Sequence, residues 1–466
     1  MPTTRPLPVL LTLALACVAF ALSQTLVVPA LPALAREFDA SQAAVSWVLT
    51  GFLLSASIAT PIVGKLGDLY GKGRMLTIIL LVFSAGAVIN ALAGSIEVVI
   101  AGRLLQGAAG GVFPLAFGII RDTFPREQIP SGIAIISAIF GIGAGIGLPL
   151  SGVIVDHVDL QWLFWSNLIA LPAAFTAHRL IPPSPPVEDA RVDWLGALLL
   201  SGALAGVLLG VSRGSEWGWG SPANALSIGG GLALAAAFVA VEARVREPLI
   251  DLEVLKARSV AATNLTGFLV GVAMFSSFLI IPQFAQTPEG VGYGFGFTVT
   301  EAGLLLTPTA LAQLLAGAPA ARLAERIGFR AVLSLGTVLI AAAFLFNTFA
   351  HAHPWELVVG GVLLGSGMTL AFASMANLIV EAVAQTEVGI ATGINTVMRT
   401  VGGSFGAAAA TAILTASLIG PLPTEGAYTA AFAFSAGAGL LALLASRLVP
   451  RSGHPVTVAA VAGRTR

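Results

Sequence analysis

The sequence predicts an all-α integral membrane protein made of two pseudo-symmetric six-helix bundles with two extra transmembrane helices between them. The chain is 56% hydrophobic and only 10% charged, with a mean hydropathy of +0.92, whereas soluble domains carry about 25% charged residues. Its apolar stretches are long and separated by short polar ones. The segment GKLGDLYGKGR at 64–74 has a degraded echo, ARLAERIGFR, at 321–330, which places Asp68 and Glu325 in matching positions. Internal repeats of this kind are common in polytopic membrane proteins.

A helix needs roughly 20 apolar residues to cross the hydrocarbon core, and fourteen stretches satisfy this. The first is longer than the apolar part of a secretory signal, about 7–15 residues, so we expect a membrane helix there rather than a leader. The predicted spans are 7–28, 43–63, 75–94, 96–119, 131–154, 161–181, 194–211, 224–241, 260–285, 300–321, 331–350, 356–380, 389–418 and 429–448.

The distribution of Lys and Arg predicts the orientation. With fourteen spans and a cytoplasmic N-terminus, 19 Lys and Arg residues fall in inner segments and 2 in outer loops, Arg36 and Arg213. An excess of Lys and Arg marks the cytoplasmic side, so both termini are predicted to be cytoplasmic. The predicted units are an N-terminal bundle (1–181), linkers with the two extra helices (182–258), a C-terminal bundle (259–449) and a cytoplasmic, disordered tail (450–466).

Several classes of function are disfavoured by composition and motifs. The net charge is zero and there is one cysteine, Cys17, which argues against a nucleic-acid partner and excludes an intrachain disulfide. His351 and His353 have no nearby cysteine or third ligand, so we expect no metal, and no phosphate-binding Gly-x-x-x-x-Gly-Lys-Ser/Thr motif occurs. We therefore expect no cofactor and no enzymatic activity. A channel would show symmetric pore-lining repeats rather than two degenerate halves.

Three motifs resemble the major facilitator superfamily, and within it the fourteen-span drug/proton antiporters of the multidrug efflux type. The segment around Asp68 resembles the loop between spans two and three. Residues 103–111, RLLQGAAGG, resemble the fourth-span motif, and residues 161–167, QWLFWSN, resemble the sixth-span entry of the fourteen-span branch. The resemblance implies two bundles that alternate access to a central cavity, with export driven by proton exchange.

Two positions depart from the family pattern. The first span reads Leu-Ser-Gln-Thr where the family often has Leu-Asp-x-Thr, so Ser23 stands at the carboxylate position. The fifth span carries an imperfect antiporter motif, in which Leu148 is inserted and Ser151 replaces a glycine. These departures leave proton coupling through the first span and the direction of transport open. The motif residues that match are Gly143, Gly147, Pro149 and Gly152.

Two arginines are predicted to lie inside the membrane. Arg103 falls about seven residues into the fourth span, roughly 10 Å deep, with Gln106 on the same face. A charge at this depth is costly unless it faces a partner or a cavity; the alternatives are a structural arginine bonded to carbonyls or, by resemblance, a role in proton coupling with a rim carboxylate such as Asp122. Arg399 falls roughly 15 Å into the thirteenth span. It either pairs with carbonyls or a rim acid, or favours neutral and anionic substrates over dications.

The loop around Asp68 is predicted to close against the other half. A carboxylate there can accept hydrogen bonds from Lys or Arg and face the positive end of an opposing helix. Arg74 and its basic neighbours also satisfy the orientation rule. If the resemblance holds, mixed amide and aromatic side chains line the substrate cavity, because such surfaces adapt to loosely shaped ligands. The predicted lining residues are Gln24, Thr25, Asn264, Phe268, Phe275, Gln283, Gln313 and Asn395.

The sequence thus predicts a monomeric carrier in the lipid bilayer that exports small amphipathic compounds in exchange for protons. A proton-coupled importer or a facilitator of a small organic solute remains the alternative, since the fifth-span motif is imperfect. Arg outnumbers Lys twenty to three, a bias typical of GC-rich bacterial genomes. We therefore expect a bacterial cytoplasmic membrane as the location.

Overall fold

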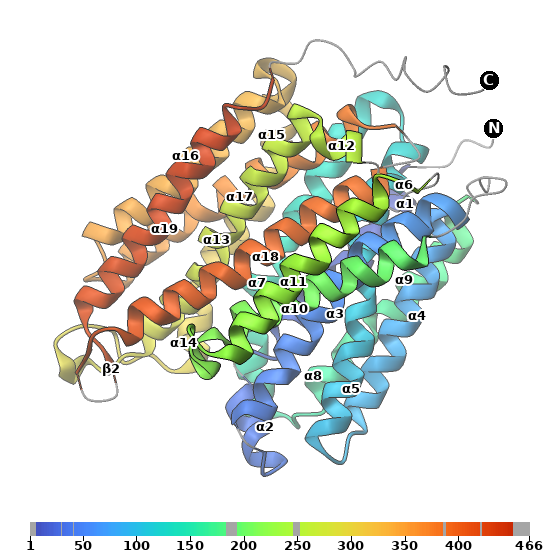
Figure 1. The fold of residues 1–466 in the computed structure, drawn as a ribbon. Coiled ribbons are helices and arrows are strands. Elements are labelled where there is room, and N and C mark those ends of the chain that lie inside the picture. Colours follow the sequence, from blue (N-terminus) through green and yellow to red (C-terminus); the bar gives the residue numbers. More distant parts are fainter. Residues whose placement is uncertain are drawn as a thin grey trace, which may run out of the picture.

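The computed structural model describes residues 6–28, 30–40, 42–182, 193–245, 252–384, 388–419 and 422–450. In this part of the chain the structure is helical apart from one two-stranded antiparallel ribbon, so the all-α prediction is confirmed (Figure 1). Residues 451–466 of the predicted tail 450–466, and residues 183–192 and 246–251 of the predicted unit 182–258, lie outside the described residues.

The helices of the first half come in the order α1 to α9, with three short 3₁₀ segments. Their bounds are α1 (Pro6–Thr25), α2 (Leu31–Glu37), α3 (Gln42–Tyr70), α4 (Lys72–Ala91), α5 (Ile96–Gly107), η1 (Ala108–Gly111), α6 (Val112–Thr123), η2 (Arg126–Gln128), α7 (Ile129–His157), α8 (Trp162–Trp165), η3 (Ser166–Ile169) and α9 (Ala170–Leu180).

A helical hairpin and a second set of helices follow. Their bounds are α10 (Trp194–Trp217), α11 (Pro222–Glu242), α12 (Leu252–Lys256), α13 (Arg258–Gln286), η4 (Glu289–Val291), α14 (Val299–Leu305), α15 (Thr307–Ile327), α16 (Phe329–Phe349), α17 (Pro354–Ala382), α18 (Val388–Thr415), β1 (Leu418–Ile419), β2 (Leu422–Pro423) and α19 (Glu425–Ser446).

The predicted count of fourteen spans is not supported. Within the described residues, 12 helices are long and apolar enough to cross a membrane. The two predicted spans that this number leaves out are 131–154 and 161–181. The first coincides with α7, where several side chains are outside the description, and the second is divided into α8, η3 and α9. Pro172 explains the division, because it has no N–H to donate to the carbonyl of Leu168.

A proline also breaks the predicted tenth span. α14 ends at Leu305 and α15 begins at Thr307, next to Pro308. Pro308 accounts for this break, because it has no N–H to donate to the carbonyl of Leu304. Pro114 has the same effect in the fourth span, where η1 separates α5 from α6, since its ring cannot donate to the carbonyl of Gly110.

Corresponding positions in the two halves have the same local geometry. Gly71 and Gly328, 257 residues apart, both have positive φ angles, 99° and 81°, and each precedes the next helix, α4 and α16. Glycine adopts this conformation without steric cost. Asn90 on α4 packs under Gly102 of α5, and Asn347 on α16 packs under Gly360 of α17. The repeat suggested by Asp68 and Glu325 therefore extends to the packing of the helices that follow.

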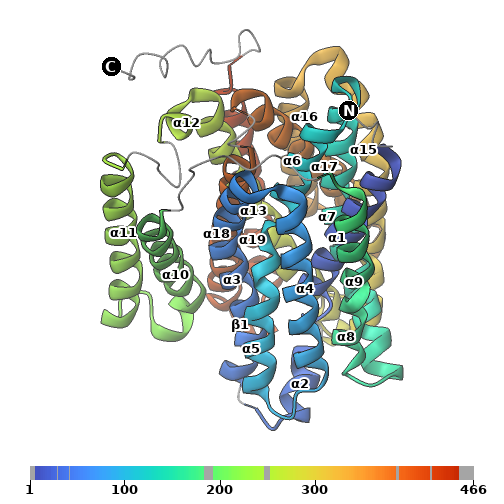
Figure 2. The same ribbon diagram turned by 90° about the vertical axis from the view of Figure 1, so that its right-hand side faces the viewer.

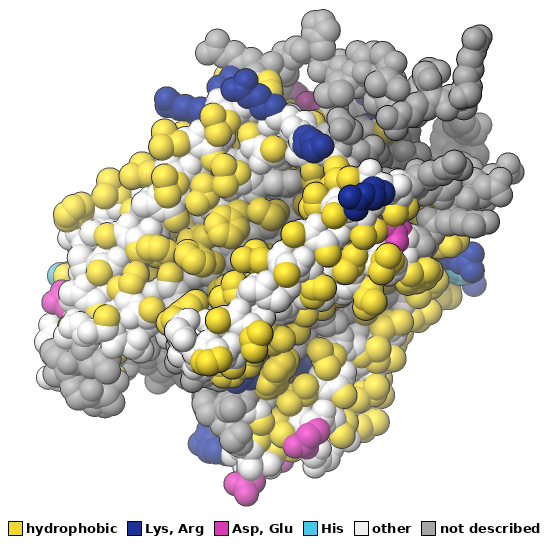
Figure 3. All heavy atoms as spheres, in the orientation of Figure 1, with side chains coloured by type: hydrophobic (Ala, Val, Ile, Leu, Met, Phe, Trp, Pro, Cys, Tyr) yellow, Lys and Arg dark blue, Asp and Glu magenta, His cyan; other side chains and the backbone are white. Residues whose placement is uncertain are grey.

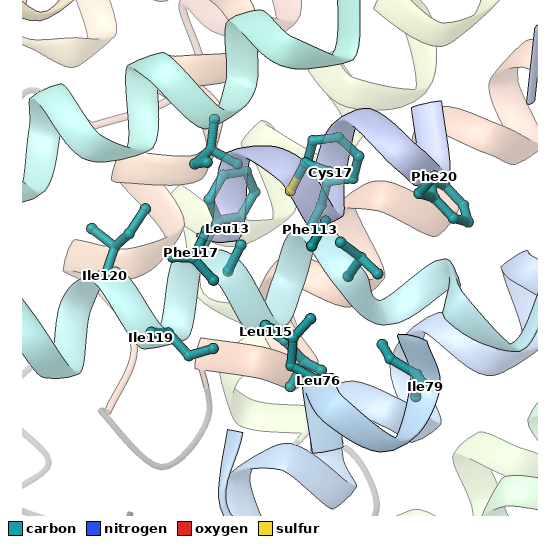
Figure 4. Close-up of a cluster of buried hydrophobic side chains, with 14 of the residues drawn as sticks. Leu13, Cys17, Phe20, Leu76, Ile79, Phe113, Leu115, Phe117, Ile119 and Ile120 are labelled. Carbon is teal, nitrogen blue, oxygen red and sulfur yellow. The ribbon is translucent and has the colours of Figure 1, made fainter. Parts of the chain in front are cut away.

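Each half has an apolar core, and that of the first half also includes buried residues of α13, α17 and α18. The core of the first half joins α1, α4, α6 and α9, and Figure 4 shows Leu13, Cys17 and Phe20 of α1 facing Phe113 and Phe117 of α6. Cys17 is a buried free thiol in this core. The core of the second half joins α13, α16, α17 and α19. Burial of these apolar side chains against one another holds each bundle together.

The two halves meet along two lines. On one side α7 packs against α14, α15 and α17, and on the other α18 packs against α3 and α6. The α10–α11 hairpin lies beside the second line, with α10 facing α3 and α18 and α11 farther out (Figure 2). The boundaries predicted for the separate units stay a prediction.

One end of the molecule carries most of the visible Lys and Arg side chains; we name it the basic end (Figure 3). The turn between α3 and α4 and the turn between α15 and α16 lie there. α1 starts and α19 ends at the same end: Arg330 of α16 donates to the carbonyl of Arg447 at 2.6 Å, and α1 runs parallel to α7, with Ala21 beside Gly143 and Thr25 beside Gly147. This arrangement requires an even number of crossings.

Candidate functional site

A fully buried arginine organises a polar cluster inside the first half. Arg103 of α5 has no exposed surface. Its Nη1 donates to Ser23 Oγ at 2.7 Å and to Gln106 Oε1 at 3.1 Å, its Nε donates to the carbonyl of Val48 at 3.1 Å, and its guanidinium lies 4.1 Å from the ring centroid of Phe52. Three neutral acceptors and an aromatic face thus offset the desolvation of the charge.

Asn90 of α4 extends this cluster. Its Nδ2 donates to Gln106 Oε1 at 3.0 Å, so one amide oxygen accepts from two side chains. Arg103 makes no ion pair with a carboxylate in the described part of the chain. Ser23, which stands where the family has a carboxylate, supplies only a hydroxyl. Gln106, predicted to share a helix face with Arg103, accepts a hydrogen bond from it, whereas Asp122, the predicted rim carboxylate, pairs with Lys72.

A second cluster lies at the basic end. Asp68 of α3 has 1% of its side chain exposed, and its Oδ1 lies 3.3 Å from the Nζ of Lys72. Lys72 Nζ also donates to Asp122 Oδ2 at 3.0 Å. The other carboxylate oxygen of Asp68 accepts from the backbone N–H of Ile390 at 3.3 Å. Asp68 therefore binds a cation of its own half and the first turn of α18 in the other half.

Close backbone contact accompanies this hydrogen bond. A Cβ on Gly389 would lie 2.6 Å from the carbonyl oxygen of Gly64, and a Cβ on Gly64 would lie 2.5 Å from the carbonyl oxygen of Gly389. Only glycine permits this approach. We name the contact formed by Gly64, Asp68, Gly389 and Ile390 the Asp68 seam.

Another hydrogen bond joins the halves near the Asp68 seam. Arg121 Nη2 donates to the carbonyl of Val383 at 3.1 Å. The predicted contact of the Asp68 loop with the other half is therefore present in the structure. Arg74 is exposed on the first turn of α4, and the cation at the seam is instead Lys72, which the sequence prediction missed. Its spacing of four residues from Asp68 was the available signal.

The glycines of the antiporter-like motif lie on two faces of α7. Gly143 and Gly147 pack against α1, where the hydroxyl of Thr25 donates to the carbonyl of Gly143. Gly152 faces Thr300 at the start of α14 in the other half. Pro149 lies inside α7. The motif residues thus pack α7 against both halves.

Arg399 lies in the second half, apart from the Arg103 cluster along the chain and in contact with different helices. It is buried in α18, with its guanidinium 4.4 Å from the ring centroid of Phe372 and its Nη2 donating to Thr396 Oγ1 at 3.3 Å. Its backbone lies directly against Gly271 of α13. The structure does not bring the two buried arginines into one cluster.

The predicted cavity residues have diverse surroundings. Asn395 Nδ2 donates to Asn264 Oδ1 at 3.1 Å, which links α18 to α13. Thr25 is a packing residue between α1 and α7. Gln313 is buried, and its backbone carbonyl accepts from Thr369 at 2.8 Å. Their assignment to a substrate cavity stays a prediction; Gln24, Phe268 and Phe275 are half-buried and Gln283 is exposed.

Comparison with protein families shows what class this fold and these motifs define. The model of the major facilitator superfamily matches residues 13–293 and 263–464. The chain therefore belongs to the major facilitator superfamily. It is a multi-pass membrane transporter and not an enzyme. The two matches fit the repeated geometry of the two halves.

Several curated relatives are transporters of bacterial origin. The multidrug transporter protein MdtP of Bacillus subtilis is 27% identical over 80% of this chain and 68% of its own length. The tetracenomycin C resistance and export protein of Streptomyces glaucescens is 28% identical over 84% of this chain and 72% of its own length. A multidrug resistance protein B homolog of Mycobacterium tuberculosis is 30% identical over 76% of this chain and 66% of its own length.

A solved structure has the same fold. The human organic anion transporter MFSD10 (TETRAN) superposes with a TM-score of 0.68 over 96% of this chain and 100% of that chain, at 17% identity. At this identity the match establishes the fold alone.

Proposed function

We propose that this transporter exports small amphipathic, drug-like compounds across a bacterial cytoplasmic membrane in exchange for protons, by alternating access. The names of the relatives support the substrate class, since they describe multidrug transport, drug resistance and antibiotic export. Both termini are taken to be cytoplasmic, which matches the basic end, and the chain is taken to work as a monomer.

The observation that carries this proposal is the Asp68 seam. The halves meet there through glycine backbones, one hydrogen bond from Ile390 to Asp68 and one from Arg121 to Val383. The glycine–glycine contact itself buries little apolar surface, whereas Val383, Val388 and Ala391 of the second half belong to the apolar core of the first half and must leave it when the seam opens. In this proposal the seam opens to load substrate from the cytoplasm and closes before the substrate is released on the opposite side.

The Arg103 cluster supports a restricted substrate class. Its charge is solvated by neutral groups, and a transporter specialised for dications would benefit from a carboxylate at this depth. We propose that neutral and anionic amphipathic compounds are preferred over dications, with Arg399 contributing to this preference. Resistance profiles of cells expressing the protein and its Arg399→Ala variant test this: strong selective resistance to dications, unaffected by the variant, would contradict it.

Proteoliposome flux tests the transport mechanism directly. Purified protein is reconstituted, and the movement of fluorescent amphipathic probes is followed with a pH gradient of either sign. Exchange with protons predicts that reversing the gradient reverses the net flux. Probe flux that is independent of the pH gradient would indicate a facilitator. Probe flux in the same direction as the protons would indicate a proton-coupled importer.

A further inference from the structure

The α10–α11 hairpin contacts the two helices that form the Asp68 seam. α10 packs against α3 of the first half and α18 of the second half. Among the described residues, one apolar cluster collects side chains from both halves and from the hairpin. Its buried members are Ala197 of α10, Phe238 of α11 and Ile390 of α18, and Ile62, Leu199, Leu200, Leu255 and Ile394 pack around them.

Ile390 belongs to the seam and to the hairpin cluster at once. Its backbone N–H donates to Asp68 of α3 at 3.3 Å, and its side chain, 4% exposed, belongs to the cluster with Ala197 and Phe238. The same residue is therefore held by the first half through its backbone and by the hairpin through its side chain. If α18 moves away from α3, it loses both contacts together.

The opposite end of α10 is attached to the first half. The guanidinium of Arg213 lies 5.2 Å from the ring centroid of Trp47 on α3, and Arg213 is buried. A cation–π contact of this kind contributes about 0.5–2 kcal/mol. The hairpin thus has one attachment to α3 far from the Asp68 seam and another to both α3 and α18 beside the seam.

The two helices of the hairpin pack closely against each other, so we treat the hairpin as one rigid unit. Gly206 and Gly231 bring its two helices together, since a Cβ on Gly206 would lie 2.8 Å from the Cα of Gly231. Ser227 Oγ donates to the carbonyl of Gly206 at 2.8 Å. Asp193 caps α10 by accepting from the N–H of Gly196 at 2.8 Å. The outer face of the hairpin points away from the two halves, and Leu226 of α11 on that face is 75% exposed.

We propose that the α10–α11 hairpin is a conformational clamp that stays with the first half and stabilises the state closed at the Asp68 seam. It does so by burying Ile390 and Ile394 of α18 only while α18 lies against α3. Opening at the basic end releases these side chains from the hairpin, so the hairpin sets the equilibrium between the two states. The inference rests on the proposed alternating access and adds a role for the two helices outside the repeated halves.

Spin-label distances across the basic end test the clamp without any substrate. Labels are placed at Glu127 and Glu381, both exposed, in a Cys17→Ala background. Phe238→Ala and Ile394→Ala should each raise the ratio of open to closed populations about tenfold, equivalent to about 1.4 kcal/mol. Leu226→Ala, on the outward face of α11, is the matched control and should leave the ratio unchanged.

Gly389→Ala separates failure of the clamp from failure of the proposed function. It should open the seam directly, whatever the hairpin does. If it shifts the distances while Phe238→Ala and Ile394→Ala do not, the clamp is refuted and alternating access stands. If none of the three shifts the distances, the halves do not separate at the seam, and both proposals are refuted.

Cross-linking tests the asymmetry of the two attachments. A short thiol-reactive cross-linker between cysteines at Leu200 and Ile394 should fix α10 to α18 and reduce transport at least tenfold, with recovery on cleavage of the linker. The same reagent between cysteines at Arg213 and Trp47 fixes α10 to α3 and should leave transport unchanged relative to the cleaved sample. Equal effects of the two cross-links would refute the assignment of the hairpin to the first half.

Discussion

Replacing Gly389 with alanine should prevent α18 from closing on α3. The new Cβ would lie 2.6 Å from the carbonyl oxygen of Gly64 and 2.8 Å from Asp68 Oδ2, whereas ordinary contact begins at 3.4 Å. α18 and α3 must move apart by about 0.8 Å, the difference between 3.4 Å and 2.6 Å, before the alanine side chain fits. This lengthens the 3.3 Å hydrogen bond from Ile390 to Asp68 beyond useful range, because hydrogen bonds weaken steeply with distance.

The loss of the Ile390–Asp68 hydrogen bond and the cost of overpacking add up to a rough total for Gly389→Ala. A hydrogen bond to a charged group contributes about 1.5–3 kcal/mol, and overpacking costs about 1–3 kcal/mol. The lower limit of the sum, about 2.5 kcal/mol, shifts the equilibrium away from the closed state by nearly two orders of magnitude. Only the closed state is affected, since Gly389 and Gly64 meet only when the seam is formed.

Transport in proteoliposomes measures the effect of Gly389→Ala. We expect at least a tenfold loss of turnover with a normal yield of folded protein. Gly437→Ala in α19 is the matched control, because no atom lies within 4 Å of its added Cβ, and replacing a helical glycine by alanine stabilises a helix by about 0.5–1 kcal/mol. Wild-type turnover in Gly389→Ala would refute the reasoning about the seam.

Three further substitutions probe the Lys72 bridge, the Arg103 cluster and the packing of α18 against α13. Lys72→Met should lower the melting temperature in scanning fluorimetry, because breaking a buried ion pair costs about 3–5 kcal/mol; an unchanged melting temperature would contradict the Lys72 bridge. Arg103→Lys should reduce proteoliposome transport at least tenfold at a normal protein yield, since an ammonium cannot reproduce the fixed fork of donors; full activity would show that the charge alone suffices. Gly402→Ala should lower the melting temperature by an amount equivalent to about 1–3 kcal/mol, because its Cβ would collide with the carbonyl oxygen of Phe268, whereas Gly437→Ala should not.

Much of the architecture could be predicted from hydropathy and from one repeated motif. The match of Asp68 and Glu325 predicted equivalent segments in the two halves, and the structure gives the glycines that follow them, Gly71 and Gly328, positive φ angles. The span count was harder, because 131–154 and 161–181 are not among the 12 candidate spans, whereas helices interrupted at η1 and at Leu306 still count as single spans. These interruptions are local effects of Pro114 and Pro308, since proline has no N–H to donate.

The candidate site was predicted less completely, for a physical reason. The pairing of Arg103 with Gln106 follows from helical spacing alone. Its contact with Ser23, 80 residues away in the chain, depends on how α1 packs against α5. Lys72 looked like one more cytoplasmic charge, and its position between Asp68 and Asp122 arises only from the approach of α4 to α6.

By itself the sequence determined a helical membrane protein with a duplicated plan and two arginines in its apolar stretches, because hydropathy and short-range spacing are properties of the chain. Only the tertiary structure decided which groups contact those arginines, and where the two halves meet. Those outcomes depend on contacts between helices far apart in sequence, such as Ile390 with Asp68, which form only when the bundles pack together.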